Sequence, residues 1–178
     1  MEANTVFSAA GLPSQAGGAS STAEFQFAAS VATDVGAAGT RLVCRLPGSD
    51  KLNQKSFWVR AWGRVAGATT NFTVRLDSGI SATIGSNTTI EASSARAVGG
   101  VAGNWLIEAR CVLDGASDVL AGFGRSMVKN LFDAEGALDA APTVDPASEG
   151  LGFTVTGQFS ASDATNLAIC DGFEIVVA

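Results

Sequence analysis

Apolar and polar residues alternate along several stretches of the chain, which is typical of β-strands with one buried face. The clearest case is the stretch 56–65, which is followed, after a short loop containing Gly67, by the stretch 71–76. The two faces of the first stretch consist of Phe57, Val59, Ala61 and Val65 on one side and Trp58, Arg60, Trp62 and Arg64 on the other. Two strands joined by about five loop residues, one of them glycine, predict a β-hairpin.

The same alternation recurs along most of the chain. Further strands are expected within 24–31, 41–46, 88–92, 105–113, 119–127, 153–159 and 173–177. Polar, glycine-rich connections separate these stretches, and 128–140 is the only region with room for a short helix. Eight or nine strands without intervening helices predict an all-β fold, a two-sheet antiparallel β-sandwich. Eight strands in two sheets is the count of a jelly roll, so we expect that topology.

The first 22 residues differ from the rest of the chain. They are mostly small and polar, and Phe7, Leu12 and Pro13 are their sizeable apolar residues. Such a segment buries too little apolar surface to become ordered alone. We therefore expect residues 1–22 to be a tail, or an extended N-terminal arm that becomes ordered on a partner, and residues 23–178 to form the β-sandwich domain.

Composition and charge exclude several classes of partner. The chain carries 11 basic and 17 acidic residues, a net charge of −6. Nucleic acid and anionic membrane surfaces are therefore not expected as partners, since both select basic patches. No apolar run approaches the roughly 20 residues that span a bilayer. The segment Met1–Thr5 does not resemble a secretory signal, which favours synthesis in a cytoplasm unless a signal has been removed.

The residues that usually carry catalysis or bind metals are sparse. The chain has no histidine, which removes histidine-based triads and histidine-ligated metal sites. Gly99, Gly100 and Gly103 precede a strand rather than a helix, and this disfavours a phosphate loop. The three cysteines, Cys44, Cys111 and Cys170, are expected to be buried thiols, a single disulfide being the alternative.

The acidic residues do not suggest an enzyme either. Glu108 and Arg110 share a strand face and are expected to form a surface ion pair rather than part of a glycosidase pair. A cluster of acids between two strands is expected to be a solvated loop, with a weak cation site as the alternative. These acids are Asp133, Glu135, Asp139, Asp145 and Glu149. No catalytic residue, cofactor or metal is predicted, and the chain is not expected to be an enzyme.

The row of tryptophan and arginine residues on the first strand is the best candidate for an interaction site. Both residue types are enriched at interface hot spots, and guanidinium groups stack on indole rings. A loop or arm of the same chain could cover this row, or it could form an intermolecular contact or an aromatic platform for sugars. The candidate interface residues are Phe7, Leu12, Trp58, Arg60, Trp62 and Arg64.

Three stretches, 56–76, 103–114, and 152–160 together with 171–177, resemble the jelly-roll virion proteins of tailed double-stranded DNA bacteriophages. The resemblance is strongest to capsid decoration (cement) proteins. It implies a protein without enzymatic activity, often a homotrimer, that binds the major capsid protein on the outer capsid surface after synthesis in the host cytoplasm. The alternatives are a tail-associated receptor- or carbohydrate-binding module and, third, a small hydrolase using carboxylates.

Overall fold

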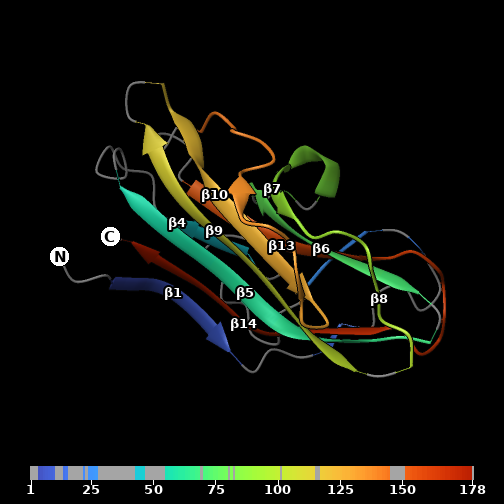
Figure 1. Cartoon of the computed structure of the whole chain (residues 1–178). Helices are drawn as coiled ribbons and strands as arrows, with labels where there is room; N and C mark the ends of the chain where they lie inside the picture. The colour runs from blue at the N-terminus through green and yellow to red at the C-terminus, as the bar shows by residue number, and fades with distance from the viewer. Residues whose placement is uncertain are drawn as a thin grey trace.

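The computed structural model describes most of the chain. The described residues are 4–10, 14–15, 22, 24–27, 43–46, 55–68, 70–79, 81, 83–100, 102–114, 117–144 and 151–177; of 4–10, 14–15 and 43–46 only the backbone is described. Two antiparallel sheets pack face to face, as Figure 1 shows. The predicted all-β sandwich is therefore confirmed.

The first sheet contains the longest strands. In spatial order it consists of β1 (Asn4–Ala10), β14 (Leu167–Val177), β5 (Ser56–Ala66), β9 (Gly103–Asp114), β10 (Val119–Val128) and β11 (Leu131–Phe132). The short strands β2 (Ser14–Gln15) and β12 (Gly136–Ala137) pair with β14 and β10, respectively.

The second sheet is centred on β13 (Leu151–Phe159) and β6 (Asn71–Ser78). Both β3 (Phe25–Gln26) and β4 (Val43–Leu46) pair with β13, at different ends. On the other side of β6 lie β7 (Thr88–Ala92) and the short β8 (Arg96–Ala97). A 3₁₀ turn at Ile84–Ser86 precedes β7.

The pairing of strands is nested along the chain. Strand β1 pairs with β14, β3 and β4 pair with β13, β5 pairs with β9, and β6 pairs with β7. Successive pairs alternate between the first and second sheets, as if one long hairpin had been rolled up. The β10–β12 segment extends the first sheet beyond this pattern.

The core lies between the two sheets and follows the alternation in the sequence. Apolar residues of β5 and β9 predicted to face inward are almost completely buried, including Phe57, Val59 and Ile107. The indole of Trp105 fits into this core because Gly63 lies opposite it in the sheet. A Cβ atom at Gly63 would lie 2.7 Å from the Trp105 ring and 1.9 Å from the carbonyl oxygen of Ile169. The Trp105 Nε1–H donates to that same carbonyl at 3.1 Å.

The predicted hairpin of 56–65 with 71–76 is wrong. These stretches form β5 and β6, which belong to different sheets, so the chain crosses the sandwich between Ala66 and Asn71. The in-sheet neighbours of β5 are β14 and β9. Both strands bury one face in the same core, and alternation does not distinguish strands that pair from strands that face each other.

The region 128–140, the only one with room for a short helix, is fully described and contains turns and short strands instead. Lys129 and Asn130 have φ angles of 52° and 63°, and they reverse the chain between β10 and β11. The strand predicted at 88–92 is confirmed as β7, and those at 105–113, 119–127, 153–159 and 173–177 lie within β9, β10, β13 and β14. Residues 28–31 and 41–42 of the other expected strands lie outside the described residues.

The N-terminal segment provides an edge strand of the first sheet. Within the predicted arm, β1 pairs antiparallel with β14, and Figure 1 shows the two strands side by side near both termini. The boundary between arm and domain at residue 22 stays a prediction. None of the helical residues in the described part of the chain forms a segment long and apolar enough to cross a membrane.

Candidate interaction surface

The four candidate residues of β5 lie on one surface, here called the outer face. It consists of the side chains of β14, β5, β9 and β10 that point away from the second sheet. The guanidinium carbon of Arg60 lies 4.4 Å from the ring centroid of Trp58 and 5.6 Å from that of Trp62. Arg60 therefore links the two indole rings through cation–π contacts.

A glycine on the neighbouring strand allows Trp62 to lie against the sheet. Gly172 of β14 is opposite Trp62, and a Cβ atom there would lie 2.2 Å from the indole ring. Any larger residue at this position would displace the indole. The glycine at position 172 is thus required by the indole of Trp62, which is more than a hundred positions away in the sequence.

An ionic row crosses the centre of the outer face. Its members, which are cross-strand neighbours in this order, are Glu174, Arg60, Glu108 and Arg125. Ion pairs join Arg60 to Glu174 and Arg125 to Glu108. The Glu108 side chain is only 7% exposed, so the row is packed closely enough to bury a carboxylate.

The predicted ion pair between Glu108 and Arg110 is wrong. Glu108 pairs with Arg125 of β10, which is its direct cross-strand neighbour, and it is buried rather than at the surface. Residues directly opposite each other on adjacent strands lie closer than residues two apart along one strand, and this favours Arg125. Arg110 instead lies near Trp58, with its guanidinium carbon 5.3 Å from the ring centroid.

Arg64 lies at the end of the β5 row and is the most exposed of the four candidates. Its Nε and Nη2 atoms donate to the two carboxylate oxygens of Asp171, at 2.8 and 2.7 Å. This fork-like geometry is the strongest form of an arginine–carboxylate contact. Its exposure to solvent nevertheless limits its contribution to stability.

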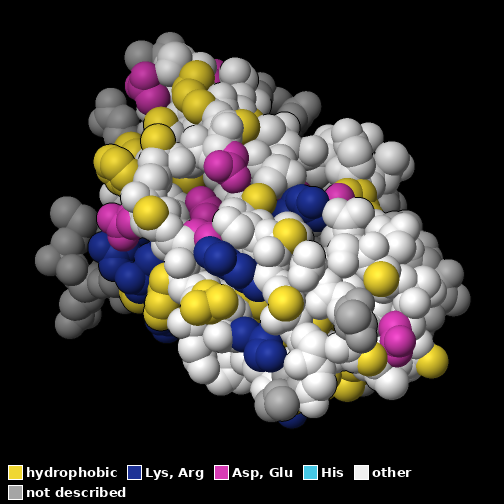
Figure 2. Space-filling view, turned by 45° about the vertical axis from the view of Figure 1, so that its right-hand side comes forward, with side chains coloured by type: hydrophobic (Ala, Val, Ile, Leu, Met, Phe, Trp, Pro, Cys, Tyr) yellow, Lys and Arg dark blue, Asp and Glu magenta, His cyan; other side chains and the backbone are white. Residues whose placement is uncertain are grey.

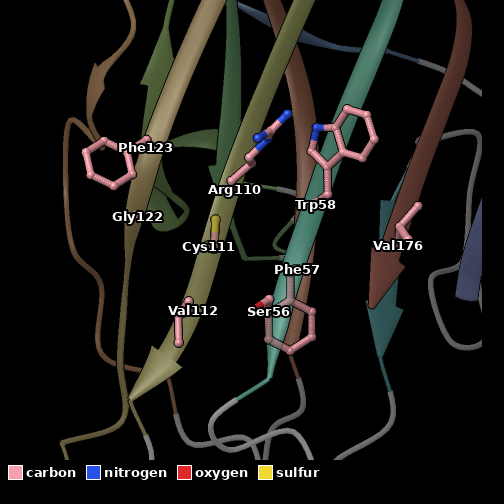
Figure 3. Close-up of a pocket in the computed structure, with 9 residues that line it drawn as sticks. All are labelled: Ser56, Phe57, Trp58, Arg110, Cys111, Val112, Gly122, Phe123 and Val176. Atoms are coloured by element: carbon pink, nitrogen blue, oxygen red, sulfur yellow. The ribbon is translucent and has the colours of Figure 1, made fainter. Parts of the chain in front are cut away.

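A groove opens beside the ionic row, toward the start of β5. Figure 3 shows its lining, and its volume is about 390 Å³. One row of cross-strand neighbours borders it and consists of Val176, Trp58, Arg110 and Phe123. Smaller side chains, Ser56 and Val112, leave it open, and Phe57 and Cys111 line it from deeper in the sheet.

Exposed apolar residues occur both at this groove and at the edge strand of the sheet. Phe123 of β10 is 62% exposed, and Leu131 and Phe132 of β11 are 55% and 57% exposed. Phe132 is opposite Met127 and therefore shares the outer side of the sheet with Phe123, whereas Leu131, opposite the buried Val128, is on the other side. Exposed aromatic side chains on one sheet surface are typical of contact sites. Figure 2 shows a face of the molecule on which apolar side chains lie beside Lys and Arg side chains.

The acidic segment after β10 is engaged in hydrogen bonds. Asp133 accepts from Arg96 Nη2 at 2.6 Å and from the backbone N–H of Ser94 at 2.9 Å. Burial alone would raise the pKa of Asp133, but hydrogen bonds from Ser94, Arg96 and Ser126 lower it. Within the part of the chain that the structure describes, no three His, Cys, Asp or Glu side chains are grouped so that they could hold a metal ion. Asp145 and Glu149 lie outside the described residues.

The cysteines are buried where they are described. Cys111 and Cys170 are free thiols, and burial raises the pKa of each to about 12. Such thiols stay protonated and act as small apolar residues, as predicted. The side chain of Cys44 lies outside the described residues.

One buried carboxylate faces the interior and forms no ion pair with an arginine of the described part of the chain. Glu91 of β7 is 7% exposed and lies against β10, where a Cβ atom at Gly124 would come within 2.0 Å of its Oε2. Burial, together with the charges of Asp139 and Asp133, raises the pKa of Glu91 to about 7, although a hydrogen bond with Ser126 opposes the shift. The group therefore lies between a strand of each sheet.

The sequence therefore identified part of this surface. It placed Trp58, Arg60, Trp62 and Arg64 together, as the structure does. Phe7 lies in β1, with its backbone opposite Ile175, but its side chain and the whole of Leu12 lie outside the described residues.

Sequence reasoning missed Arg110 and Phe123 as members of the surface. The alternation of β9 placed Arg110 outward, but only the register with β5 brings it to Trp58. Phe123 lies between Gly122 and Gly124 in the expected strand 119–127, and alternation alone does not show which face of that strand is exposed.

No family model and no curated protein matches this chain. The functional proposal therefore depends on the outer face and on the resemblance of three stretches to phage decoration proteins.

Proposed function

We propose that this protein is a non-enzymatic virion protein that decorates and stabilises a bacteriophage capsid by binding the outer surface of the major capsid protein shell. The observation that carries the proposal is the outer face of the first sheet. There, the Trp and Arg side chains share one sheet surface with Phe123, which is 62% exposed and lies opposite Arg110 on the neighbouring strand. Aromatic and arginine side chains are the groups that most often dominate protein–protein contacts.

The nested strand pairing supports the jelly-roll part of the proposal. In a jelly roll, two Greek keys arise when a long hairpin is rolled into two sheets, so the first strand pairs with the last and the middle strands with each other. The pairs β1·β14, β5·β9 and β6·β7 follow this order. The fold is thus compatible with the virion proteins that the sequence resembles.

The contacts of the tryptophan rings favour a protein partner over a sugar. A sugar ring needs an uncovered aromatic face on which to stack. Here the guanidinium groups of Arg60 and Arg110 lie over the ring of Trp58, and Arg60 also lies over that of Trp62. These contacts therefore disfavour a carbohydrate-binding module based on this tryptophan pair.

We further propose that the protein acts as a homotrimer, since joining several weak sites raises the overall affinity for a repetitive shell. Light scattering of the purified chain would measure the oligomeric state directly. A monomer at micromolar concentration would contradict this part of the proposal without affecting the binding to capsids.

The main test is to locate the protein in intact particles of the phage that encodes it. Quantitative mass spectrometry should find many copies per particle, and electron cryomicroscopy should place the sandwich on the outside of the shell. A protein confined to the tail tip, or absent from purified virions, would exclude the decoration function.

A further inference from the structure

We propose that the groove beside Arg110 is a docking site for an extended segment of a partner protein that presents a large apolar side chain next to a carboxylate. The identity of that partner as a capsid protein rests on the function proposed above. The chemistry of the segment follows from the groove itself.

The shape and lining of the groove favour an apolar side chain. Trp58 and Val176 form one wall, Phe123 forms the other, and Val112 lies between them, as Figure 3 shows. The volume of about 390 Å³ lies within the roughly 300–1,000 Å³ typical of pockets that bind small ligands. It can therefore accept a single large side chain and the backbone that carries it.

The charge of the groove favours a carboxylate beside that side chain. Three other arginines of the outer face, Arg60, Arg64 and Arg125, are each neutralised by an acidic neighbour. Arg110 contacts the ring of Trp58 and has no carboxylate partner within the described residues. In a protein with a net charge of −6, Arg110 is thus a cation without an acidic partner among the described residues, at the border of an apolar groove.

A second donor lies next to Arg110. The Nε1–H of Trp58 is buried and has no acceptor within the described residues, and Figure 3 shows it on the side of the ring that faces Arg110. A buried donor without a partner is costly, so an incoming acceptor is stabilised there. A carboxylate bound to Arg110 is placed to accept this hydrogen bond after a small movement of the guanidinium group.

A protein segment fits this lining better than an acidic sugar does. Arg110 and Ser56 are the polar side chains in the lining, whereas a sugar needs polar contacts for several hydroxyl groups. By contrast, an apolar side chain can pack against the apolar lining, and one carboxylate can pair with Arg110. Acidic oligosaccharides are therefore the competing outcome of the test.

The proposal is tested with the full chain and an array of acetylated six-residue peptides. The peptides place Phe, Leu, Ile, Met, Trp or Val next to Asp or Glu in either order, and a matched array carries Asn or Gln instead. Acidic peptides should bind at least about tenfold more tightly than their amide counterparts, since one charged hydrogen bond is lost. Equal binding to both arrays, or binding only to oligoglucuronate, would overturn the proposal.

Nuclear magnetic resonance with the best peptide locates the site. In ¹⁵N-labelled protein the indole N–H signal of Trp58, assigned by its loss in Trp58→Phe, should shift on binding. The signal of Trp105 should not, because its N–H already donates to Ile169 in the core. A shift at Trp105 with none at Trp58 would show that the peptide binds elsewhere.

Matched variants separate the specific contact from general electrostatics. Arg110→Gln should weaken the binding of acidic peptides by about tenfold or more and leave the affinity for the amide peptides unchanged. Lys55→Gln removes the same charge from an exposed residue near the groove that is not part of its lining, and it should change the affinity less than about twofold. Equal effects of the two variants would reduce the role of Arg110 to long-range attraction and overturn the proposal. Thermal unfolding of both variants checks that they fold.

Binding to virions distinguishes this proposal from the function on which it rests. If Arg110→Gln occupies capsids as fully as the wild type, the decoration function stands and the groove is not its contact site. If acidic peptides bind at Trp58 but the protein is absent from virions, the docking site stands and the partner is not a capsid protein.

Discussion

The two rows of side chains on β5 differ in what holds them in place. The inner row, with Phe57 and Val59, is almost completely buried and depends on apolar packing between the sheets. The outer row, with Trp58 and Arg60, is only partly buried and is held by ion pairs and cation–π contacts. One strand therefore combines the core of the fold with a surface whose side chains are ordered before a partner binds, which lowers the entropic cost of association.

Two buried glutamates show the same difference between the outer face, where charged groups are paired, and the interior between the sheets. Glu108 on the outer face is paired with Arg125, whereas Glu91 between the sheets has two acids, Asp139 and Asp133, as its charged neighbours. The negative charge of Glu108 is balanced by the positive charge of Arg125. The raised pKa of Glu91 instead favours its protonated, neutral form. The outer face thus tolerates buried charge better than the interior does.

The largest expected effect comes from truncating the inner row. Phe57→Ala should lower the free energy of unfolding by about 3–5 kcal/mol, because it removes a fully buried ring and leaves a cavity. Trp58→Ala, one residue further on, should cost about 1–2 kcal/mol, since its ring is partly exposed and loses mainly cation–π contacts. Urea denaturation measures both, and equal costs would contradict the division between the two rows.

The next largest effect is expected in the ionic row. Arg125→Gln should destabilise the protein by about 1–3 kcal/mol, because it leaves the buried carboxylate of Glu108 without its partner. The double variant Arg125→Gln with Glu108→Gln should recover part of this loss, since the uncompensated charge is removed as well. A double variant less stable than the single one would show that the pair matters for packing rather than for charge.

Alternation predicted much of this fold, because it reports which face of a strand is buried. It placed Phe57 inward and Trp58 outward, and it located β7 at its observed bounds. It does not report which strands are neighbours. For that reason 56–65 and 71–76 were predicted to pair, although β5 and β6 lie in opposite sheets and find their partners elsewhere in the chain.

The candidate site was predictable only along one strand. The row from Trp58 to Arg64 follows from the sequence of β5 alone, but its partners come from other strands. Arg60 and Glu174, for example, are 114 residues apart. Pairs at such separations depend on the register of non-local strands, and many registers are compatible with the same alternation. The groove beside Arg110 depends on that register in the same way.

Glu91 provides a pH-dependent test of the interior. Its pKa is raised from 4.5 to about 7 by burial and acidic neighbours, so the folded state binds its proton more tightly than the unfolded state. Stability should therefore fall between pH 4.5 and 7, on the order of 1–2 kcal/mol because solvent screens part of the charge, and level off above pH 7. Glu91→Gln lacks this titration. The free energy of unfolding of the wild type minus that of the variant should therefore decrease over the same pH range. A pH-independent difference would place Glu91 in contact with water.

The smallest effect is expected at the exposed end of the outer row. Arg64→Gln removes a two-pronged ion pair with Asp171, yet the Arg64 side chain is 57% exposed. The free energy of unfolding should therefore fall less than in any of the variants above, and the difference should decrease further in 1 M salt. Arg125→Gln under the same conditions provides the comparison, because its partner Glu108 is buried and screened less by salt. A cost at Arg64 as large as that at Arg125 would mean that burial does not separate the two ion pairs, and that the whole outer row stabilises the fold.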